Sequence, residues 1–209
     1  DGPTHQPIEQ EAQIRLLEKL KNHSGKPSLL ALRPADAAET TVAWKLALEN
    51  RSTPTALILS RQNIADLPAA SGNRYKEALQ AARGAYIVED CEGLPDVIFV
   101  ASGSEVSTMV AGAALLREKG KKVRVVSAPS EGLFRIQEAS YQESVLPAGL
   151  PKLGFTAGLP VTLEGLVGAG GRVFGLDHFG HSAPAKVLDV KLGFTAENVL
   201  AEAEALLKG

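Results

Sequence analysis

The stretch DVIFVASGSEVSTMVAGAALLREKGKKVRVV, residues 96–126, contains the pattern of a strand, a helix and a second strand in immediate succession. Residues 96–101 are predicted to form a strand, because they are a short and nearly continuous apolar run. Ser102 with Glu105 three residues later is a capping pair that marks the start of a helix. Apolar residues then recur at helical spacing, at Val106, Met109, Val110, Ala113 and Leu116. Residues 123–126 form the next strand, and this order of elements favours a parallel sheet in an α/β fold.

The same alternation extends towards both ends of the chain. Further strands are predicted at residues 28–32, 55–60, 85–88, 153–157 and 173–176. Further helices are predicted at residues 8–20, 36–49, 131–137, 183–192 and 196–207. Asp36 and Glu39 form a second capping pair at the start of one of these helices. Strands and helices that alternate with short connections predict a three-layer α/β/α protein with mostly parallel sheets, divided into two units within about residues 84–95.

The composition excludes several classes of protein. The 209 residues include one cysteine, Cys91, so an internal disulfide framework is excluded. The 22 basic and 24 acidic residues give a formal net charge of -2, which provides no basic surface for nucleic acid. No apolar run approaches the roughly 20 residues that span a bilayer, so no membrane association is expected. We therefore expect a cytoplasmic protein in which any binding of an anion depends on a few local residues.

Arg61, Gln62 and Asn63 directly follow the predicted strand 55–60 and are the first candidates for a functional site. Open parallel sheets bind ligands at the carboxyl ends of their strands. At such a position the guanidinium of Arg61 can bind a phosphate through two parallel hydrogen bonds. A structural salt bridge is the alternative for Arg61, and the position in the sequence leaves both interpretations open.

Three further features are weaker signals. Asp1 and His5 lie four residues apart and could form a metal pair or an acid-base couple, although a solvated aspartate and a histidine at a helix entry are the favoured interpretation. His178 and His181 lack a third nitrogen or sulfur ligand nearby, which argues against a metal site. Residues 168–171 are rich in glycine but do not complete a dinucleotide-binding motif.

Eight short sequence motifs are distributed along the chain. They are DGPTHQP at residues 1–7, RPAD at 33–36, PTAL at 54–57, SRQN at 60–63, ASGSEV at 101–106, ESVLP at 143–147, FGHSAP at 179–184 and GFTAENV at 193–199. They resemble motifs of the transketolase family, occur in the order and approximate spacing of that family, and cover nearly the whole chain. The DGPTHQP and SRQN motifs are together specific, so the chain closely resembles part of a transketolase.

The resemblance implies a domain organisation and an activity. Residues 1–88 would be the carboxyl-terminal half of a thiamine diphosphate pyrimidine-binding domain, and residues 89–209 a transketolase carboxyl-terminal domain. The family transfers a two-carbon ketol unit from a ketose phosphate to an aldose phosphate in the non-oxidative pentose phosphate pathway. By resemblance, Asp1 binds a sugar hydroxyl of the donor and Arg61 binds the sugar phosphate. His5 contacts the substrate near the reacting carbon, which makes it the catalytic candidate.

The resemblance also implies what lies outside this chain. A full-length transketolase is a homodimer that uses thiamine diphosphate and a divalent cation, Mg²⁺ or Ca²⁺. The family's Gly-Asp-Gly metal motif and the glutamate that activates the cofactor are absent from these 209 residues. We therefore expect an inactive fragment that holds neither cofactor nor metal by itself.

Two alternatives stay open at this point. The related deoxyxylulose-phosphate synthases and 2-oxoacid dehydrogenase β subunits share the last two domains, although the SRQN and DGPTHQP motifs favour a transketolase. A non-catalytic dimerisation or interaction module would also fit a stable chain without the cofactor motif. About 450 further residues upstream in the reading frame would favour the enzyme over the module.

Overall fold

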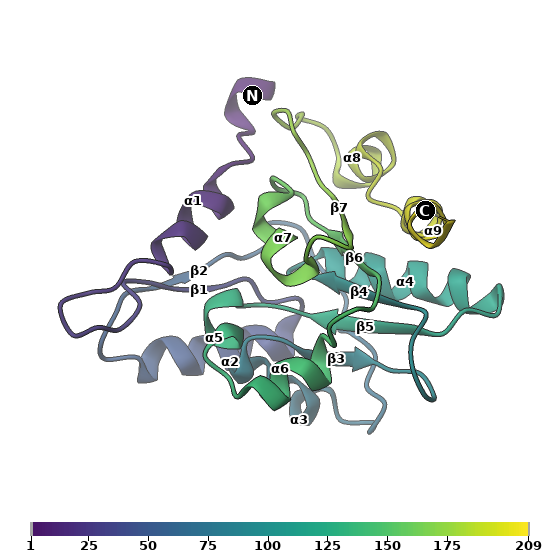
Figure 1. Ribbon diagram of the computed structural model, residues 1–209. Helices are drawn as coiled ribbons and strands as arrows, with labels where there is room; N and C mark the ends of the chain where they lie inside the picture. The colour runs from purple at the N-terminus through teal and green to yellow at the C-terminus, as the bar shows by residue number, and fades with distance from the viewer. Residues whose placement is uncertain (1, 209) are drawn as a thin grey trace.

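Two β-sheets organise the chain (Figure 1). The computed structural model describes residues 2–208. The first sheet has two parallel strands, β1 (Leu30–Leu32) and β2 (Thr55–Leu57). The second sheet has the strand order β3-β5-β4-β6-β7, with β3 (Tyr86–Glu89), β4 (Val97–Ala101), β5 (Val123–Ser127), β6 (Lys152–Phe155) and β7 (Arg172–Phe174). All neighbours in this sheet are parallel except β3 and β5, so the predicted α/β fold with mostly parallel sheets is confirmed.

Helices cover both faces of the larger sheet. In chain order the helices are η1 (Pro3–His5, a 3-10 helix), α1 (Gln10–Leu17), α2 (Ala37–Glu49), α3 (Arg74–Ala78), η2 (Leu79–Arg83, a second 3-10 helix), α4 (Glu105–Glu118), α5 (Glu131–Arg135), α6 (Ala139–Val145), α7 (Val161–Val167), α8 (Ala185–Leu192) and α9 (Ala196–Lys208). Figure 1 shows α4 and α9 on one side of the five strands and α7 on the other.

Alternate residues of β4 point into two separate apolar cores. Phe99 packs in a core with residues of α4 and α9, such as Met109 and Val199. Ile98 packs in a second core with residues of α5 and α7, such as Phe134 and Leu163. Successive side chains of a strand point to opposite faces, so a strand buried on both faces is apolar throughout. The predicted three-layer arrangement is therefore confirmed.

One predicted helix start is confirmed and the other is wrong. Asp36 precedes α2, and its Oδ1 accepts a hydrogen bond from the Glu39 backbone N–H at 2.8 Å. The pair Ser102 and Glu105 does not form a capping box, because α4 begins at Glu105 and Ser104 occupies the capping position without a side-chain cap. The Glu105 carboxylate instead binds Arg33, which lies far away in the sequence. Tertiary contacts have overridden a local pattern.

Strand β2 is shorter than predicted because of a proline in its neighbour. The backbone N–H of Ile58 still donates to the Leu32 carbonyl at 2.8 Å. The next hydrogen bond of a parallel ladder would need a backbone N–H at Pro34, and proline has none. The chain after Leu57 therefore leaves the sheet, and residues 58–67 form a loop.

Three short helices, α3, α6 and α7, were not predicted. Each is five to seven residues long. Helices of this length are marginal by themselves and depend on tertiary packing, so their sequences carry little periodic signal. For example, Val145 of α6 and Leu166 of α7 pack in the core formed with α5.

Strand β3 is confirmed at the predicted place, and its partner lies in the second sheet. Tyr86 and Ile87 pair antiparallel with Ser127 and Val126 of β5. The division of the chain into residues 1–88 and 89–209 stays a prediction. The pairing of β3 favours a boundary further upstream, so that the strand belongs to the second unit.

Limited proteolysis with a protease of broad specificity is expected to cut first within residues 68–73. This loop between the two units is mostly exposed, and exposed loop tips are the preferred sites of cleavage. The resistant fragment should keep β3 and the five-stranded sheet, whereas the two-stranded sheet should lose protection, since two strands alone are marginally stable. Amino-terminal sequencing of that fragment measures the boundary. A resistant core that begins at Cys91 or later would contradict the assignment of β3.

Candidate functional site

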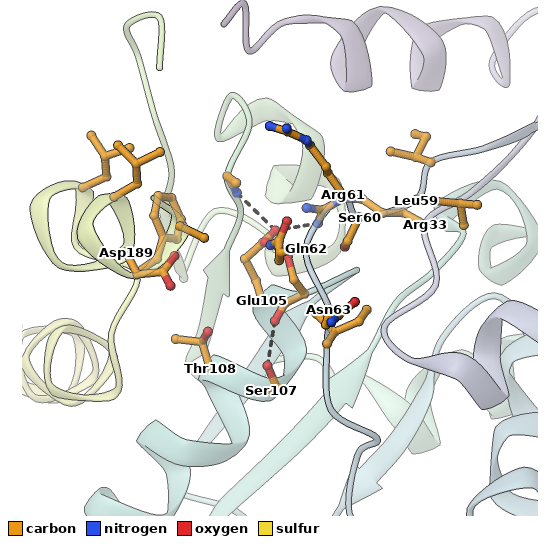
Figure 2. A pocket seen from close by; sticks show the side chains of 18 of the residues that line it. Arg33, Leu59, Ser60, Arg61, Gln62, Asn63, Glu105, Ser107, Thr108 and Asp189 are labelled. Carbon is orange, nitrogen blue, oxygen red and sulfur yellow. Dashed lines mark hydrogen bonds and ion pairs between the residues drawn. The ribbon is translucent and has the colours of Figure 1, made fainter. Parts of the chain in front are cut away.

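A cleft of about 550 Å³ lies at the carboxyl ends of β1 and β2 (Figure 2). Residues 58–65, which follow β2, form one wall of the cleft. The other walls come mainly from α4 and α8 and are lined by Ser104, Ser107, Thr108, Leu188, Asp189 and Leu192. The carboxyl ends of parallel strands are where open α/β sheets bind ligands. The structure thus places Arg61, Gln62 and Asn63 at an edge of the sheet that suits a binding site.

Arg61 lies exposed on the wall formed by the loop. Figure 2 shows its guanidinium directed away from Glu105. Among residues 2–208, no carboxylate forms an ion pair with Arg61. The alternative of a structural salt bridge therefore finds no partner in the described part of the chain. Its donors are thus free of carboxylate partners among the described residues and can bind an anion.

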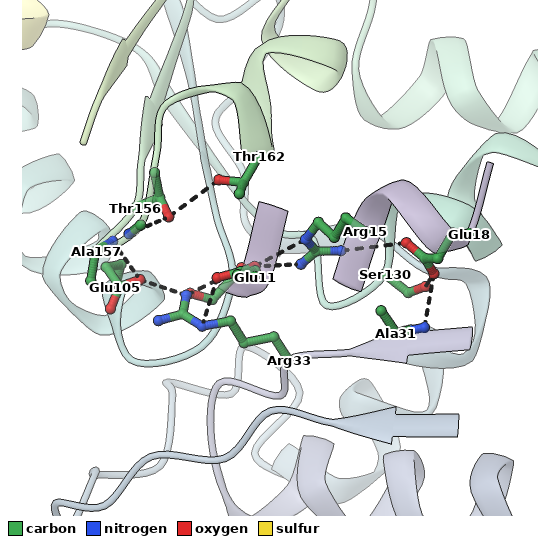
Figure 3. Close-up of polar contacts among 12 residues, drawn as sticks. Glu11, Arg15, Glu18, Ala31, Arg33, Glu105, Ser130, Thr156, Ala157 and Thr162 are labelled. Carbon is green, nitrogen blue, oxygen red and sulfur yellow. Dashed lines mark hydrogen bonds and ion pairs between the residues drawn. The ribbon is translucent and has the colours of Figure 1, made fainter. Parts of the chain in front are cut away.

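Arg33 and Glu105 form the fixed base of the cleft (Figure 3). Arg33 Nη1 donates to Glu105 Oε2 and to the Ser102 carbonyl, each at 2.5 Å. Its Nε lies 3.4 Å from Glu11 Oε2. Burial alone would lower the pKa of the Arg33 guanidinium, but the charges of Glu105 and Glu11 raise it above its ordinary value. Arg33 thus stays charged, and its Nη1 and Nε face protein partners, whereas Arg61 has no ion-pair partner among residues 2–208.

His5, the amino-terminal candidate that the structure describes, lies apart from this cleft. Asp1 lies outside the described residues. His5 ends the helix η1 and is exposed, and its Nδ1 lies 3.2 Å from Thr4 Oγ1. His5 does not line the cleft that contains Arg61. The carbonyl of the neighbouring Gln6 accepts a hydrogen bond from the backbone N–H of Gly180 at 2.8 Å. The structure therefore places His5 beside the loop before α8 and leaves the roles of Asp1 and His5 as predictions.

The two carboxyl-terminal histidines lie near each other without forming a metal site. The ring centroids of His178 and His181 are 6.0 Å apart. Within residues 2–208 there is no group of three or more His, Cys, Asp or Glu side chains that could hold a metal ion. The same range contains no helix with the length and hydrophobicity of a membrane span.

Sequence reasoning missed the contribution of α4 and α8 to the cleft. Ser107 and Thr108 lie in the first turn of a helix that follows a strand, so their position near a carboxyl edge could have been inferred. Asp189 gave no such signal, because α8 is joined to the cleft by tertiary packing alone. Burial raises the pKa of the Asp189 carboxyl, and the nearby charge of Glu105 raises it further.

Known proteins resemble the chain over its whole length. The family of the transketolase pyrimidine-binding domain matches residues 1–66, and the transketolase-like TK C-terminal domain family matches residues 84–195. Transketolase 1 of Vibrio cholerae is 45% identical over 208 residues, which are 99% of this chain and 29% of that protein.

Solved structures agree with these sequence matches. A transketolase from Leishmania mexicana has a TM-score of 0.83 at 39% identity, covering 100% of this chain and 28% of that one. A transketolase from Pichia stipitis, in complex with sedoheptulose-7-phosphate, has a TM-score of 0.83 at 36% identity, with the same coverage. The chain spans less than a third of the length of these relatives. By sequence and by structure, the chain belongs to the transketolase family.

Proposed function

We propose that the chain works as part of a transketolase subunit that transfers a two-carbon ketol unit between sugar phosphates. The observation that carries the proposal is the guanidinium of Arg61, which forms no ion pair within residues 2–208 and lies beyond the carboxyl end of β2, on the wall of a cleft. Arginine binds a phosphate through a planar pair of donors and keeps its charge at every physiological pH. A phosphorylated sugar supplies the matching anion.

In this proposal each of the three predicted site residues contacts a different part of the sugar phosphate. Arg61 binds the phosphate at one end of the sugar, and His5 contacts oxygens near the carbon that reacts. The carboxylate of Asp1 accepts a hydrogen bond from a hydroxyl of the donor sugar. An imidazole can donate or accept a hydrogen bond and can move a proton near neutral pH, which suits a position beside the reacting carbon.

The residues around the cleft do not fit a metal-bound diphosphate. Mg²⁺ requires several oxygen ligands in octahedral geometry. Of the two carboxylates that line the cleft, Glu105 already binds Arg33 and accepts from the Ala157 backbone N–H at 3.2 Å, which leaves Asp189 alone. We propose that thiamine diphosphate and its Mg²⁺ or Ca²⁺ bind to other parts of the subunit, in a cytoplasmic homodimer. The carbanion chemistry belongs to that cofactor, and the present residues bind and orient the sugar.

The test is two-carbon transfer by the full subunit that carries this chain, with thiamine diphosphate and magnesium present. The ketose phosphate should be converted to an aldose phosphate two carbons shorter, and the aldose phosphate to a ketose phosphate two carbons longer. Mass spectrometry of both products with a donor isotopically labelled in its first two carbons detects the transfer. Labelled carbon that stays in the donor would refute the proposal.

Isothermal titration of the 209-residue chain alone with thiamine diphosphate and magnesium is expected to give no saturable heat. The physical reason is the donor set around the cleft, which offers one uncommitted carboxylate to a metal. Titration of the full subunit under the same conditions is the positive control. A micromolar dissociation constant for the 209-residue chain would show that it contains a cofactor site of its own.

A further inference from the structure

The loop that carries Arg61 is attached to the rest of the protein at its two ends. At the first end, the backbone N–H of Ile58 donates to the Leu32 carbonyl at 2.8 Å. At the second end, the backbone N–H of Leu67 donates to Asp36 Oδ2 at 3.0 Å. Within the described part of the chain, residues 59–66 make no further hydrogen bond. Both attachments lie on one short segment, residues 32–36, so the position of that segment sets the position of the loop.

Arg33, in the middle of this segment, is held by the unit that contains the five-stranded sheet. Its backbone N–H donates to the Pro129 carbonyl at 2.9 Å, and its carbonyl accepts from the backbone N–H of Gly103 at 3.0 Å. Its side chain binds the turn between β4 and α4, through the Ser102 carbonyl and Glu105. The backbone and the side chain of Arg33 therefore both bind the carboxyl-terminal unit.

The contact is close enough to fix the Arg33 side chain in one place. Gly103 has a φ of +62°, and a Cβ atom at this position would lie 2.6 Å from Arg33 Cζ. The guanidinium thus rests directly against the backbone of the turn, where any larger residue would displace it. The side chains of Arg33 and Glu105 are 11% and 6% exposed, so water competes little with their ion pair.

We infer that Arg33 is a positioning residue, through which the carboxyl-terminal unit sets the place of Arg61 in the substrate site. This inference rests on the proposed function, since it assumes that Arg61 binds the sugar phosphate. The inference gives the unit around the five-stranded sheet a role in the substrate site, because the β4-α4 turn supports, through Arg33, the loop that carries Arg61. Loss of the contact between Arg33 and the β4-α4 turn should displace the Arg61 guanidinium without changing its charge or its hydrogen-bond donors.

The experiment uses the full transketolase subunit and compares a phosphorylated with an unphosphorylated acceptor sugar. Arg33→Lys keeps the charge but loses the planar guanidinium, whose Nη1 binds Ser102 and Glu105 while its Nε faces Glu11. The KM for the phosphorylated acceptor should rise by roughly 10-fold, because misplacement by about 1 Å can cost up to about 100-fold. The KM for the unphosphorylated acceptor and both kcat values should change much less. Glu105→Gln, which keeps an oxygen for the Ala157 N–H, should act in the same direction.

Arg117→Lys is the matched control for a general loss of stability. Arg117 also binds a glutamate, Glu89, and a backbone carbonyl, that of Val123, but it lies within the carboxyl-terminal unit and away from the cleft. This variant should leave the ratio of the two KM values unchanged even if its melting temperature falls.

The pair Arg33→Lys and Arg61→Ala completes a double-mutant cycle. In the absence of Arg61, Arg33→Lys should no longer change the preference for the phosphorylated acceptor.

The outcomes separate this inference from the proposed function. If Arg61→Ala itself leaves the phosphate preference unchanged, the proposed function fails. If Arg61→Ala removes the preference while Arg33→Lys and Glu105→Gln act like Arg117→Lys, only the positioning role of Arg33 fails. If Arg33→Lys does not fold, Glu105→Gln alone decides between these results, since glutamine has nearly the same shape as the glutamate.

Discussion

Arg61→Ala in the full transketolase subunit is expected to reduce kcat/KM for phosphorylated sugars by about 10- to 150-fold. A charge-assisted hydrogen bond contributes roughly 1.5 to 3 kcal/mol, and every 1.4 kcal/mol is a tenfold change. The full contribution is available because Arg61 has no ion pair to give up within residues 2–208. Steady-state kinetics with phosphorylated and unphosphorylated acceptors measures the effect.

The loss should fall mainly on KM. In the proposed site the phosphate is remote from the carbon that is transferred, so Arg61 should bind the ground state and the transition state alike, and its removal should leave kcat largely unchanged. His5→Ala is the comparison, because a residue near the reacting carbon can interact more strongly with the transition state and so lower kcat as well. Equal weakening of both acceptors by Arg61→Ala would assign Arg61 a structural role and contradict the proposed site.

Phe155→Ala is expected to lower the free energy of unfolding of the 209-residue chain by about 3 to 5 kcal/mol, the usual cost of removing a buried phenyl ring. Phe155 is fully buried at the end of β6. Its ring stacks on Phe174 with centroids 4.5 Å apart and meets the edge of Phe194 at 5.6 Å. Since Phe194 lines the cleft, the cavity left by Phe155 would also loosen one wall of the site.

Urea unfolding followed by circular dichroism measures this loss as a lower midpoint at an unchanged slope. Phe179→Ala is the matched control, because it makes the same substitution at a side chain that is 46% exposed. Exposed substitutions usually change stability by no more than about 0.5 kcal/mol. Similar midpoints for the two variants would show that the cluster of Phe155, Phe174 and Phe194 does not form as described.

Local patterns predicted the elements that depend on local physics. The apolar run of β4, the helical spacing of α4 and the Asp36 cap of α2 each involve residues close together in the sequence. The structure contains all three. The motifs quoted above also predicted the family correctly, since the matches with transketolases cover the whole chain. The roles of Asp1, His5 and Arg61 in the substrate site stay predictions.

Glu105 shows how a local pattern can mislead. Its spacing from Ser102 fits a capping box, yet its carboxylate binds Arg33, 72 residues earlier in the chain. A buried arginine needs a carboxylate partner more than a helix end needs a cap, because an unpaired buried charge costs several kcal/mol and a lost cap about 1 kcal/mol. Strand β3 is a similar case, since its sequence predicted a strand but gave no sign that it pairs with β5.

The sequence by itself determined the α/β alternation, the family and the position of Arg61 after a strand. Only the tertiary structure decided that Arg61 lacks a carboxylate partner among residues 2–208, that Asp189 of α8 faces the same cleft, and that Arg33 ties the Arg61 loop to the β4-α4 turn. Periodicity and capping arise from neighbours within a few residues, so they can be read along the chain. Burial, ion pairing and the lining of a cleft depend on which distant segments meet, and only the packing of the two units decides that.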